Sequence, residues 1–267
     1  MTKLTFNDLG LKEGLLKAIT DLGFTTPSDI QAEAIPVALN GQDIIGQAQT
    51  GTGKTAAFGL PMLNNIANRK AISSIILAPT RELAIQVHDE LVKLAKYEKL
   101  NVVAVYGGAP IHNQIRDIKK ANIVVGTPGR VLDHIRRGTL PLDSVEFLVL
   151  DEADEMLNMG FIDDMEEIMK SIPEERQTLL FSATMPPQIK KLTKKYLKDD
   201  AQHIAIARKE MTGSTITQNF FEVNGSQRLE ALCRLIDLDN PSAGIIFCRT
   251  KKGVDDLVAA MQARGYM

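Results

Sequence analysis

Short apolar runs alternate along the chain with longer segments in which apolar residues recur every three or four positions. The runs with the length and composition of buried strands are 43–48, 74–78, 102–106, 123–126, 146–150, 178–181 and 202–206. Segment 82–97 is one of the intervening segments, and its Leu83, Val87 and Leu91 fall at helical spacing. This alternation predicts an α/β fold, in which a mostly parallel sheet is sandwiched by helices.

The pattern changes near residue 207, which suggests a domain boundary. Residues 208–215 are polar and contain Gly213-Ser214, so they are predicted to form a linker between a first domain, 1–207, and a second unit, 216–267. In the second unit we expect strands at 218–223 and 243–248 and helices at 227–237 and 251–264. Because so short a segment cannot form a wound sheet, we expect an incomplete second α/β unit.

Composition narrows the class of protein. The 267 residues are 44% hydrophobic and 24% charged, which is ordinary for a soluble globular protein. The net charge of −2 excludes a global basic field, so any nucleic-acid surface must be local. Cys233 and Cys248 lie in apolar contexts, which indicates reduced thiols. With no signal peptide or membrane-length apolar run, we expect a cytoplasmic protein without a membrane partner.

A glycine-rich segment follows the first strand candidate and precedes a helical pattern. The segment reads Ala48, Gln49, Thr50, Gly51, Thr52, Gly53, Lys54, Thr55. Its glycines let backbone N–H groups turn toward an anion, Lys54 would reach the β- and γ-phosphates, and Thr55 would ligate Mg²⁺. Ala48 departs from the general pattern, which has glycine first. The alternative is a glycine-rich turn without a ligand.

Two acidic residues follow the buried run 147–150. Ligands bind at the carboxyl ends of parallel strands in open α/β sheets, and this is where Asp151 and Glu152 are predicted to lie. Asp151 would hold Mg²⁺, and Glu152 would orient or deprotonate an attacking water. Alternatively, the pair is simply the acidic first turn of a helix.

Several further motifs follow one another in a fixed order, and the whole series resembles the bacterial DEAD-box ATP-dependent RNA helicases. The motifs are Phe6 with Gly23-Phe24-Thr25-Thr26-Pro27-Ser28-Asp29-Ile30-Gln31, then Pro79-Thr80-Arg81, Gly107-Gly108, Thr127-Pro128-Gly129-Arg130, Asp151-Glu152-Ala153-Asp154, Ser182-Ala183-Thr184 and Ile246-Phe247-Cys248-Arg249-Thr250. The resemblance covers essentially the whole chain. It implies two RecA-like units, and it accounts for Ala48, which this family accepts.

The resemblance also implies a nucleotide site for ATP and Mg²⁺. Beside the residues 48–55, the ATP-binding residues would be Phe6, Phe24, Thr26 and Gln31, with Lys54, Asp151 and Glu152 catalytic. Gln31 offers the donor and the acceptor that an adenine edge requires, and Phe6 would stack on the ring. On the residues alone, Gln31 on a helix surface and Phe6 as a core anchor are equally good interpretations.

An RNA surface is implied in the same way. Its residues would be Pro79, Thr80, Arg81, Gly107, Gly108, Thr127, Pro128, Gly129 and Arg130. Arginine donates charge-assisted hydrogen bonds to phosphate, and such contacts are indifferent to sequence. Helix capping by Thr80 and Thr127 is the alternative, and it is compatible with phosphate binding.

Ser182 and Thr184 would couple the state of ATP to RNA binding, through hydrogen bonds with Asp154. The alternative is local capping of the helix that Pro186-Pro187 opens. The lysines that follow are better explained as the solvated face of that helix than as an RNA patch, because Ile189, Leu192 and Tyr196 form an apolar face at helical spacing. These lysines are Lys190, Lys191, Lys194, Lys195 and Lys198.

The function implied is ATP-dependent unwinding of short RNA duplexes and remodelling of ribonucleoproteins, on single-stranded or duplex RNA, with proteins of RNA decay or ribosome assembly as partners. The family's later HRxGRxGR segment, which supplies arginine fingers, does not occur, so the resemblance implies a truncated second domain and weak activity. The alternatives are an ATP-gated RNA clamp without unwinding, and a P-loop kinase or transporter ATPase.

Overall fold

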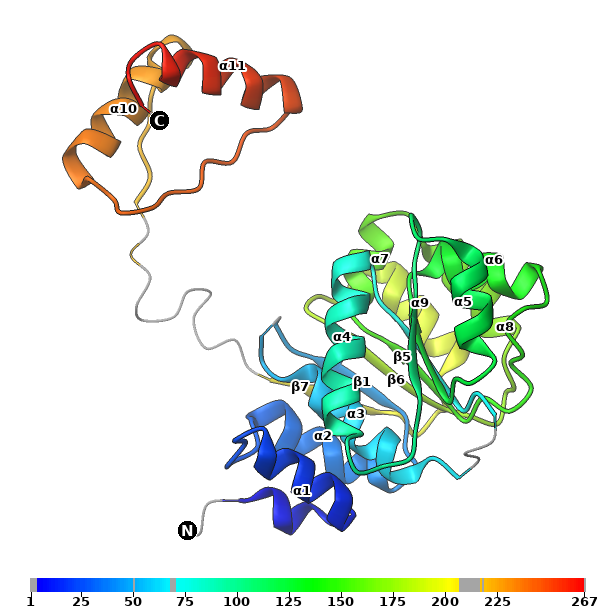
Figure 1. Cartoon of the computed structure of the whole chain (residues 1–267). Coiled ribbons are helices and arrows are strands. Elements are labelled where there is room, and N and C mark those ends of the chain that lie inside the picture. The colour runs from blue at the N-terminus through cyan, green and yellow to red at the C-terminus, as the bar shows by residue number, and fades with distance from the viewer. Residues whose placement is uncertain (1–3, 50, 68–70, 207–216, 218, 267) are drawn as a thin grey trace. The chain divides into compact units, whose positions relative to one another are not determined.

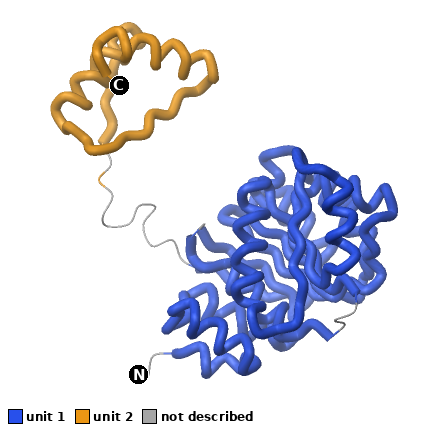
Figure 2. Tube along the Cα trace, viewed as in Figure 1, with its two compact units in different colours: residues 1–208 blue, residues 209–267 orange. Residues whose placement is uncertain are grey.

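The computed structural model describes residues 4–49, 51–67, 71–206, 217 and 219–266. It divides into two compact units, Met1–Arg208 and Lys209–Met267 (Figure 2). The first unit contains one seven-stranded parallel sheet (Figure 1). The strands are β1 Ile44–Gln47, β2 Ser74–Leu77, β3 Val102–Val105, β4 Ile123–Gly126, β5 Phe147–Leu150, β6 Gln177–Ser182 and β7 Gln202–Ala205. All seven predicted strands of this unit are present.

Helices connect the strands and cover both faces of the sheet (Figure 1). They are η1 Phe6–Leu9, α1 Glu13–Asp21, α2 Asp29–Leu39, α3 Lys54–Asn65, α4 Arg81–Leu94, α5 Ile111–Ile118, α6 Pro128–Arg136, α7 Ala153–Asn158, α8 Ile162–Lys170 and α9 Pro187–Tyr196. Parallel strands need such crossovers, because each connection must return to the starting edge of the sheet.

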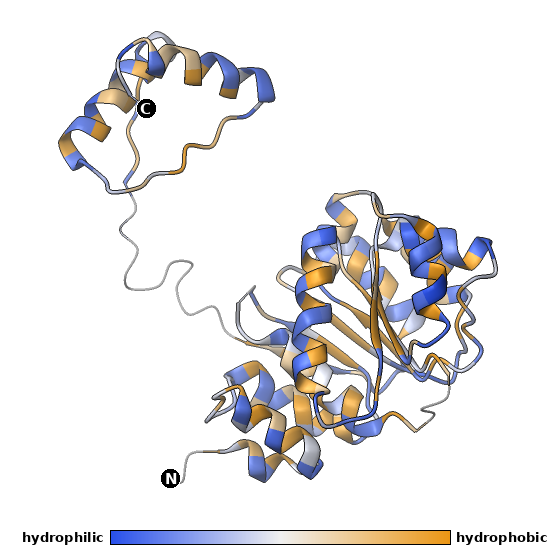
Figure 3. Cartoon of the chain, viewed as in Figure 1, coloured by the Kyte–Doolittle hydropathy of each residue, from blue (hydrophilic) through white to orange (hydrophobic). Residues whose placement is uncertain are grey.

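Each strand of the sheet interior is apolar on both sides, because helices bury both faces. On β2, Ile76 packs with the cluster that contains α1–α4, whereas Ile75 and Leu77 pack with the cluster that contains α5–α9. Figure 3 shows the resulting apolar strands between helices that turn their polar faces outward. The predicted fold class, a RecA-like parallel sheet sandwiched by helices, is therefore confirmed for the first unit.

The strand order, β3-β4-β2-β5-β6-β1-β7, brings distant segments of the chain together. Strand β6 pairs with β5 on one side and with β1 on the other. The residues after β1, β5 and β6 are the glycine-rich loop, Asp151-Glu152 and Ala183-Thr184, so three predicted motifs meet at one edge of the sheet.

The second unit contains η2 Gly225–Gln227, α10 Arg228–Asp239 and α11 Lys251–Gln262. Both predicted helices are present, but the predicted strands are wrong for residues 219–223 and 243–248, which form no strand. A strand needs a neighbour for its N–H and C=O groups, and the described part of this unit offers none. Phe247 is consequently 90% exposed. The predicted linker, 208–215, lies outside the described residues.

The lysine-rich helix α9 is a solvated amphipathic helix, as predicted. Ile189 and Leu192 are buried, and Lys190 and Lys194 are exposed. Both cysteines are free thiols. No helix in the described part of the chain is long and apolar enough to span a membrane.

Candidate functional site

The glycine-rich loop connects the end of β1 to the start of α3. Gly51 and Gly53 adopt φ angles of +81° and +86°, in the left-handed region that favours glycine. Lys54 is the first residue of α3, so its side chain and the N-terminus of the helix lie at the same point. Thr52 Oγ1 donates to Gln49 O at 2.8 Å within the loop. Thr50 is outside the described residues.

The start of α2 holds this loop in place. Gln31 Nε2 donates to Gly53 O at 3.0 Å, and Ser28 Oγ donates to Thr52 O at 2.8 Å. Ser28 N donates in turn to Gln31 Oε1 at 2.9 Å, which is half of a capping box. Gln31 is therefore buried against the loop. Sequence analysis gave Ser28 no role, although the capping-box spacing of Ser28 and Gln31 was visible.

The aromatic pair of the predicted adenine site lies beside α2. Phe6 is only 4% exposed and belongs to the core, and its ring stacks on Phe24 with centroids 6.4 Å apart. Phe24 is 39% exposed, and Thr26 is also exposed. In this structure, then, Phe6 is a core anchor, and Phe24 presents the accessible ring.

Lys54 meets the acidic pair at the centre of the site. Its Nζ lies 4.0 Å from Asp151 Oδ1 and 3.9 Å from Glu152 Oε1. Lys54 and Asp151 are 6% and 3% exposed, and among the described residues neither Lys54 Nζ nor Asp151 Oδ1 has a hydrogen-bond partner. Burial raises the pKa of Asp151 to about 6, although Lys54 opposes the rise. Two buried polar atoms thus face each other without being satisfied.

Glu152 and Glu90 complete this region. Glu152 has φ +52°, an uncommon conformation for a residue other than glycine, and it is the N-cap residue of α7. On α4, burial raises the pKa of Glu90, although a hydrogen bond with Thr55 opposes the rise. Glu90 was missed by sequence analysis, because nothing in its helical pattern marks a contact with a loop far away in the chain.

These residues fit a cation that is shared with phosphate. No three His, Cys, Asp or Glu side chains cluster as metal ligands in the described ranges. Mg²⁺ usually binds one or two carboxylates, substrate phosphates and several waters, rather than a cage made only of protein. Asp151 Oδ1, which has no hydrogen-bond partner among the described residues, and Thr55 in the first turn of α3 match that donor set.

Asp154 ties β6 to α7 through a compact hydrogen-bond network. Its Oδ2 accepts from Thr184 N at 2.9 Å and Thr184 Oγ1 at 2.8 Å, as predicted. Ser182 Oγ accepts from Asp154 N at 3.3 Å and donates to Thr184 O at 2.6 Å. Burial disfavours the charge of Asp154, but the hydrogen bonds from Thr184 and Ser182 outweigh it and lower the pKa.

The predicted RNA residues lie after β2, β3 and β4, on the other half of the sheet edge. Thr80 caps α4, since Leu83 N donates to its Oγ1 at 3.2 Å, and Pro79 before it is buried. The guanidinium of Arg81 lies over the Tyr106 ring, 5.0 Å from its centroid. Gly107 and Gly108 are exposed, with Gly108 at φ +79°. Arg81 is thus anchored while its charge faces solvent.

The Thr127–Arg130 motif begins α6. Pro128 is buried at the first turn, Gly129 is exposed, and the Thr127 side chain makes no capping bond to the helix. Arg130 Nη1 donates to Ala109 O at 3.0 Å, so this motif holds the loop that contains the two glycines.

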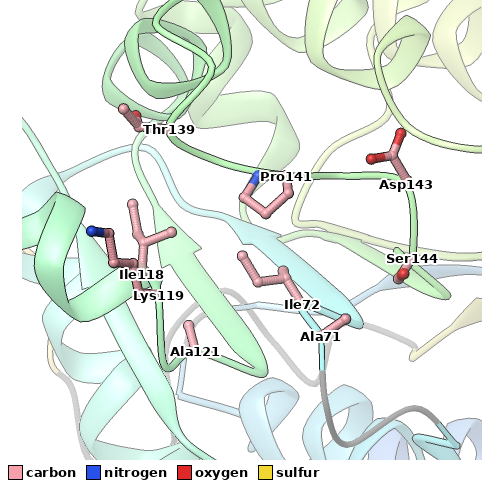
Figure 4. A pocket seen from close by; sticks show the side chains of 9 residues that line it. All are labelled: Ala71, Ile72, Ile118, Lys119, Ala121, Thr139, Pro141, Asp143 and Ser144. Atoms are coloured by element: carbon pink, nitrogen blue, oxygen red, sulfur yellow. The ribbon is translucent and has the colours of Figure 1, made fainter.

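A separate cavity of about 240 Å³ contains none of the predicted site residues (Figure 4). Its lining includes Ile72, which precedes β2, Ile118, which ends α5, and Pro141, which precedes β5. Most of the described site residues thus lie at the carboxyl edge of the sheet, in two groups: the residues after β1, β5 and β6, which are predicted to bind nucleotide or to couple its state to RNA binding (the nucleotide half), and the residues after β2, β3 and β4, which are predicted to bind RNA (the RNA half).

The chain is also similar in sequence to known proteins. The DEAD/DEAH box helicase family model matches residues 28–192. The chain is 52% identical over 264 residues to the DEAD-box ATP-dependent RNA helicase CshA of Bacillus cereus, covering 98% of this chain and 50% of the relative. It is 53% identical to the ATP-dependent RNA helicase CshA of Listeria monocytogenes, covering 100% and 51%. The chain spans about half the length of the curated relatives it matches.

Solved structures show the same similarity. The crystal structure of a DEAD box protein from Methanococcus jannaschii matches with a TM-score of 0.75 and 46% identity, covering 98% of this chain and 71% of that one. A hypothetical ATP-dependent RNA helicase from Sulfolobus tokodaii matches with a TM-score of 0.69 and 38% identity, covering 73% and 57%.

Proposed function

This chain belongs to the DEAD/DEAH box helicase family, and from that premise we propose that it is the ATP- and RNA-binding part of an RNA helicase that locally unwinds short RNA duplexes and remodels ribonucleoproteins. Relatives of twice its length are named ATP-dependent RNA helicases, which supports the reaction class. Free thiols at both cysteines are in keeping with a cytoplasmic setting, where RNA-decay or ribosome-assembly proteins would be its partners.

The observation that carries the proposal is the unsatisfied pair at the sheet edge. Lys54 Nζ and Asp151 Oδ1 are buried without hydrogen-bond partners, which is unfavourable unless a ligand completes them. A nucleotide triphosphate would do so: the loop N–H groups and Lys54 bind its phosphates, and Asp151 with Thr55 holds Mg²⁺. When bound, Mg²⁺ would neutralise phosphate charge. Glu152 orients the attacking water and accepts its proton.

The RNA half supports binding through the RNA backbone. Arg81 and Arg130 present guanidinium groups at the ends of neighbouring segments, and the exposed glycine loop offers backbone N–H groups. Such contacts are indifferent to base sequence and weaken steeply with salt. The 2′-hydroxyl would allow the protein to distinguish RNA from DNA.

Coupling between the two halves would pass through Asp154. It follows the acidic pair directly and accepts both hydrogen bonds from Thr184. A shift of the acidic pair on hydrolysis would therefore move Thr184 with it, and this movement would release RNA.

The test is ATP hydrolysis with and without single-stranded RNA, followed by strand separation on matched RNA and DNA duplexes, by a protein in which a complete second RecA-like domain follows the first. We expect RNA to stimulate turnover and the RNA duplex to be preferred; equal activity on an all-DNA duplex would contradict the proposal. In a Glu152→Gln variant, turnover should be lost and RNA binding prolonged in ATP. RNA held in an ATP-dependent manner without strand separation would instead identify a clamp.

A further inference from the structure

The RNA half contains a buried amide that no predicted motif includes. Gln114 of α5 is 6% exposed and hydrogen-bonded at both ends. Its Nε2 donates to Tyr106 O at 3.0 Å, and its Oε1 accepts from Arg130 Nη1 at 3.0 Å and from His134 Nε2 at 3.0 Å. We propose that Gln114, held by His134, is a positioning residue that orients Arg130 and the glycine loop for RNA. This inference rests on the proposed function.

The chemistry of the partners determines the orientation of this amide. Arg130 can only donate and the Tyr106 carbonyl can only accept, so Oε1 must face the guanidinium and Nε2 the carbonyl. Since Oε1 can only accept, His134 Nε2 carries the hydrogen. His134 Nδ1 then faces Thr139 Oγ1 at 2.8 Å. One hydrogen-bond chain thus runs from Thr139 through His134 and Gln114 to Arg130.

The network holds the glycine loop at both ends. Gln114 bonds the carbonyl of Tyr106 before Gly107, and Arg130 bonds the carbonyl of Ala109 after Gly108. The Tyr106 ring in turn lies under Arg81, 5.0 Å from its guanidinium. Gln114 therefore bonds directly to Arg130 and to Tyr106, the residue whose ring lies under Arg81. Both arginines are ones that we assign to RNA, although Gln114 lies in neither of their motifs.

A neutral amide suits this position better than a carboxylate. Glutamate would also accept from Arg130, but it would cancel the charge that phosphate needs and present no donor to Tyr106 O. The nearest carboxylate contact of Arg130 is with Asp133, at 4.0 Å, too long for a hydrogen bond. Gln114 thus orients the guanidinium and leaves its charge available.

The experiment is a double-mutant cycle read by RNA affinity. Binding of a fluorescein-labelled single-stranded oligouridylate is titrated for the wild-type chain, Gln114→Ala, Arg130→Ala and the double variant. Asn113→Ala, at an exposed amide on the same helix, is the control. ATP affinity and the thermal midpoint are measured in parallel, because a general folding defect would lower all three readouts.

We expect Arg130→Ala and Gln114→Ala each to weaken RNA binding about 5- to 10-fold, and the double variant to be little weaker than Arg130→Ala alone. ATP affinity should change less than RNA affinity, and Asn113→Ala should bind like wild type. Fully additive losses, or an unchanged RNA affinity in Gln114→Ala, would overturn the inference. An unchanged affinity in Arg130→Ala would instead overturn the RNA role of Arg130, and the inference with it.

Gln114→Glu provides an independent test, because it keeps the size of the side chain and an acceptor for Arg130. It should weaken RNA binding and reduce the slope of log affinity against log salt by about 0.7, the contribution of one phosphate contact on a single strand. RNA binding with the wild-type slope would show that a neutral partner for Arg130 is not required.

Discussion

The two halves of the sheet edge differ in whether their buried polar atoms are hydrogen-bonded. On the side that we propose binds nucleotide, Lys54 Nζ and Asp151 Oδ1 are buried without hydrogen-bond partners among the described residues. On the RNA side, Arg130, Gln114 and His134 form one hydrogen-bonded network. Buried polar groups without hydrogen bonds are unfavourable, so we expect a ligand to complete the first half, whereas the hydrogen bonds of the second half are already formed in the absence of RNA.

Lys54→Met gives the largest expected effect and tests the nucleotide side directly. Turnover of ATP should fall on the order of 10²- to 10³-fold, because a cation aimed at phosphate is lost. The thermal midpoint without ligand should change little, because Asp151, whose pKa burial already raises to about 6, can take up a proton once its counter-ion is removed. Lys191→Met, at an exposed position on α9, is the control. A loss of stability that matches the loss of activity would make Lys54 a structural counter-ion.

Gly53→Ala and Gly51→Ala form a matched pair for the loop. Both glycines have positive φ, but of the two only Gly53 has no room for a Cβ, which would collide with Gln31 Nε2. We expect Gly51→Ala to cost about 1–2 kcal/mol of stability and Gly53→Ala about 2–3 kcal/mol, measured by chemical denaturation.

Adding Gln31→Ala to Gly53→Ala should recover part of the difference between the two glycine variants, since the obstructing side chain is removed. No recovery would mean that backbone strain alone explains the loss.

Asp154→Asn weakens the link between the halves. Removing the charge from the acceptor of Thr184 should cost about 1 kcal/mol of stability, and ATP should then promote RNA binding less than in wild type. RNA affinity is measured with and without a non-hydrolysable ATP analogue. Glu155→Gln, an exposed neighbour on α7, is the control. An unchanged effect of ATP would remove Asp154 from the coupling path.

The smallest effect concerns His134 and pH. Burial and the nearby Arg130 lower the pKa of this imidazole in the folded protein, so on acidification the unfolded chain takes up a proton first. Stability from this group is therefore complete above the ordinary pKa of histidine, near 6.5, and is lost as pH falls toward the folded value. The free energy of unfolding of wild type and His134→Asn should converge between about pH 8 and about pH 5. The control is His112→Asn, at an exposed position, and its free energy of unfolding should vary with pH as that of wild type does. If the difference between wild type and His112→Asn shrank as much on acidification, His134 would be excluded as the source of the pH dependence.

Local patterns account for what could be predicted. All strands of the first unit were correct, because each is a short apolar run bounded by turn residues, and burial on both faces of a parallel sheet demands such runs. The positions of Lys54, Asp151 and Asp154 at strand or helix boundaries follow from the same patterns. The strands predicted for the second unit were wrong, because an apolar run forms a strand only when a neighbouring strand pairs with it, and the described part of this unit contains none.

The sequence by itself determined the fold class and the ends of the strands at which functional residues lie, since both depend on periodicity and turn chemistry within short windows. Only the tertiary structure decided that β6 separates β1 from β5, that Phe6 is a core residue, that Glu90 contacts Thr55 and that Gln114 accepts a hydrogen bond from Arg130. Strand order and contacts between distant residues depend on how helices and sheet pack against one another, and no local pattern records that packing.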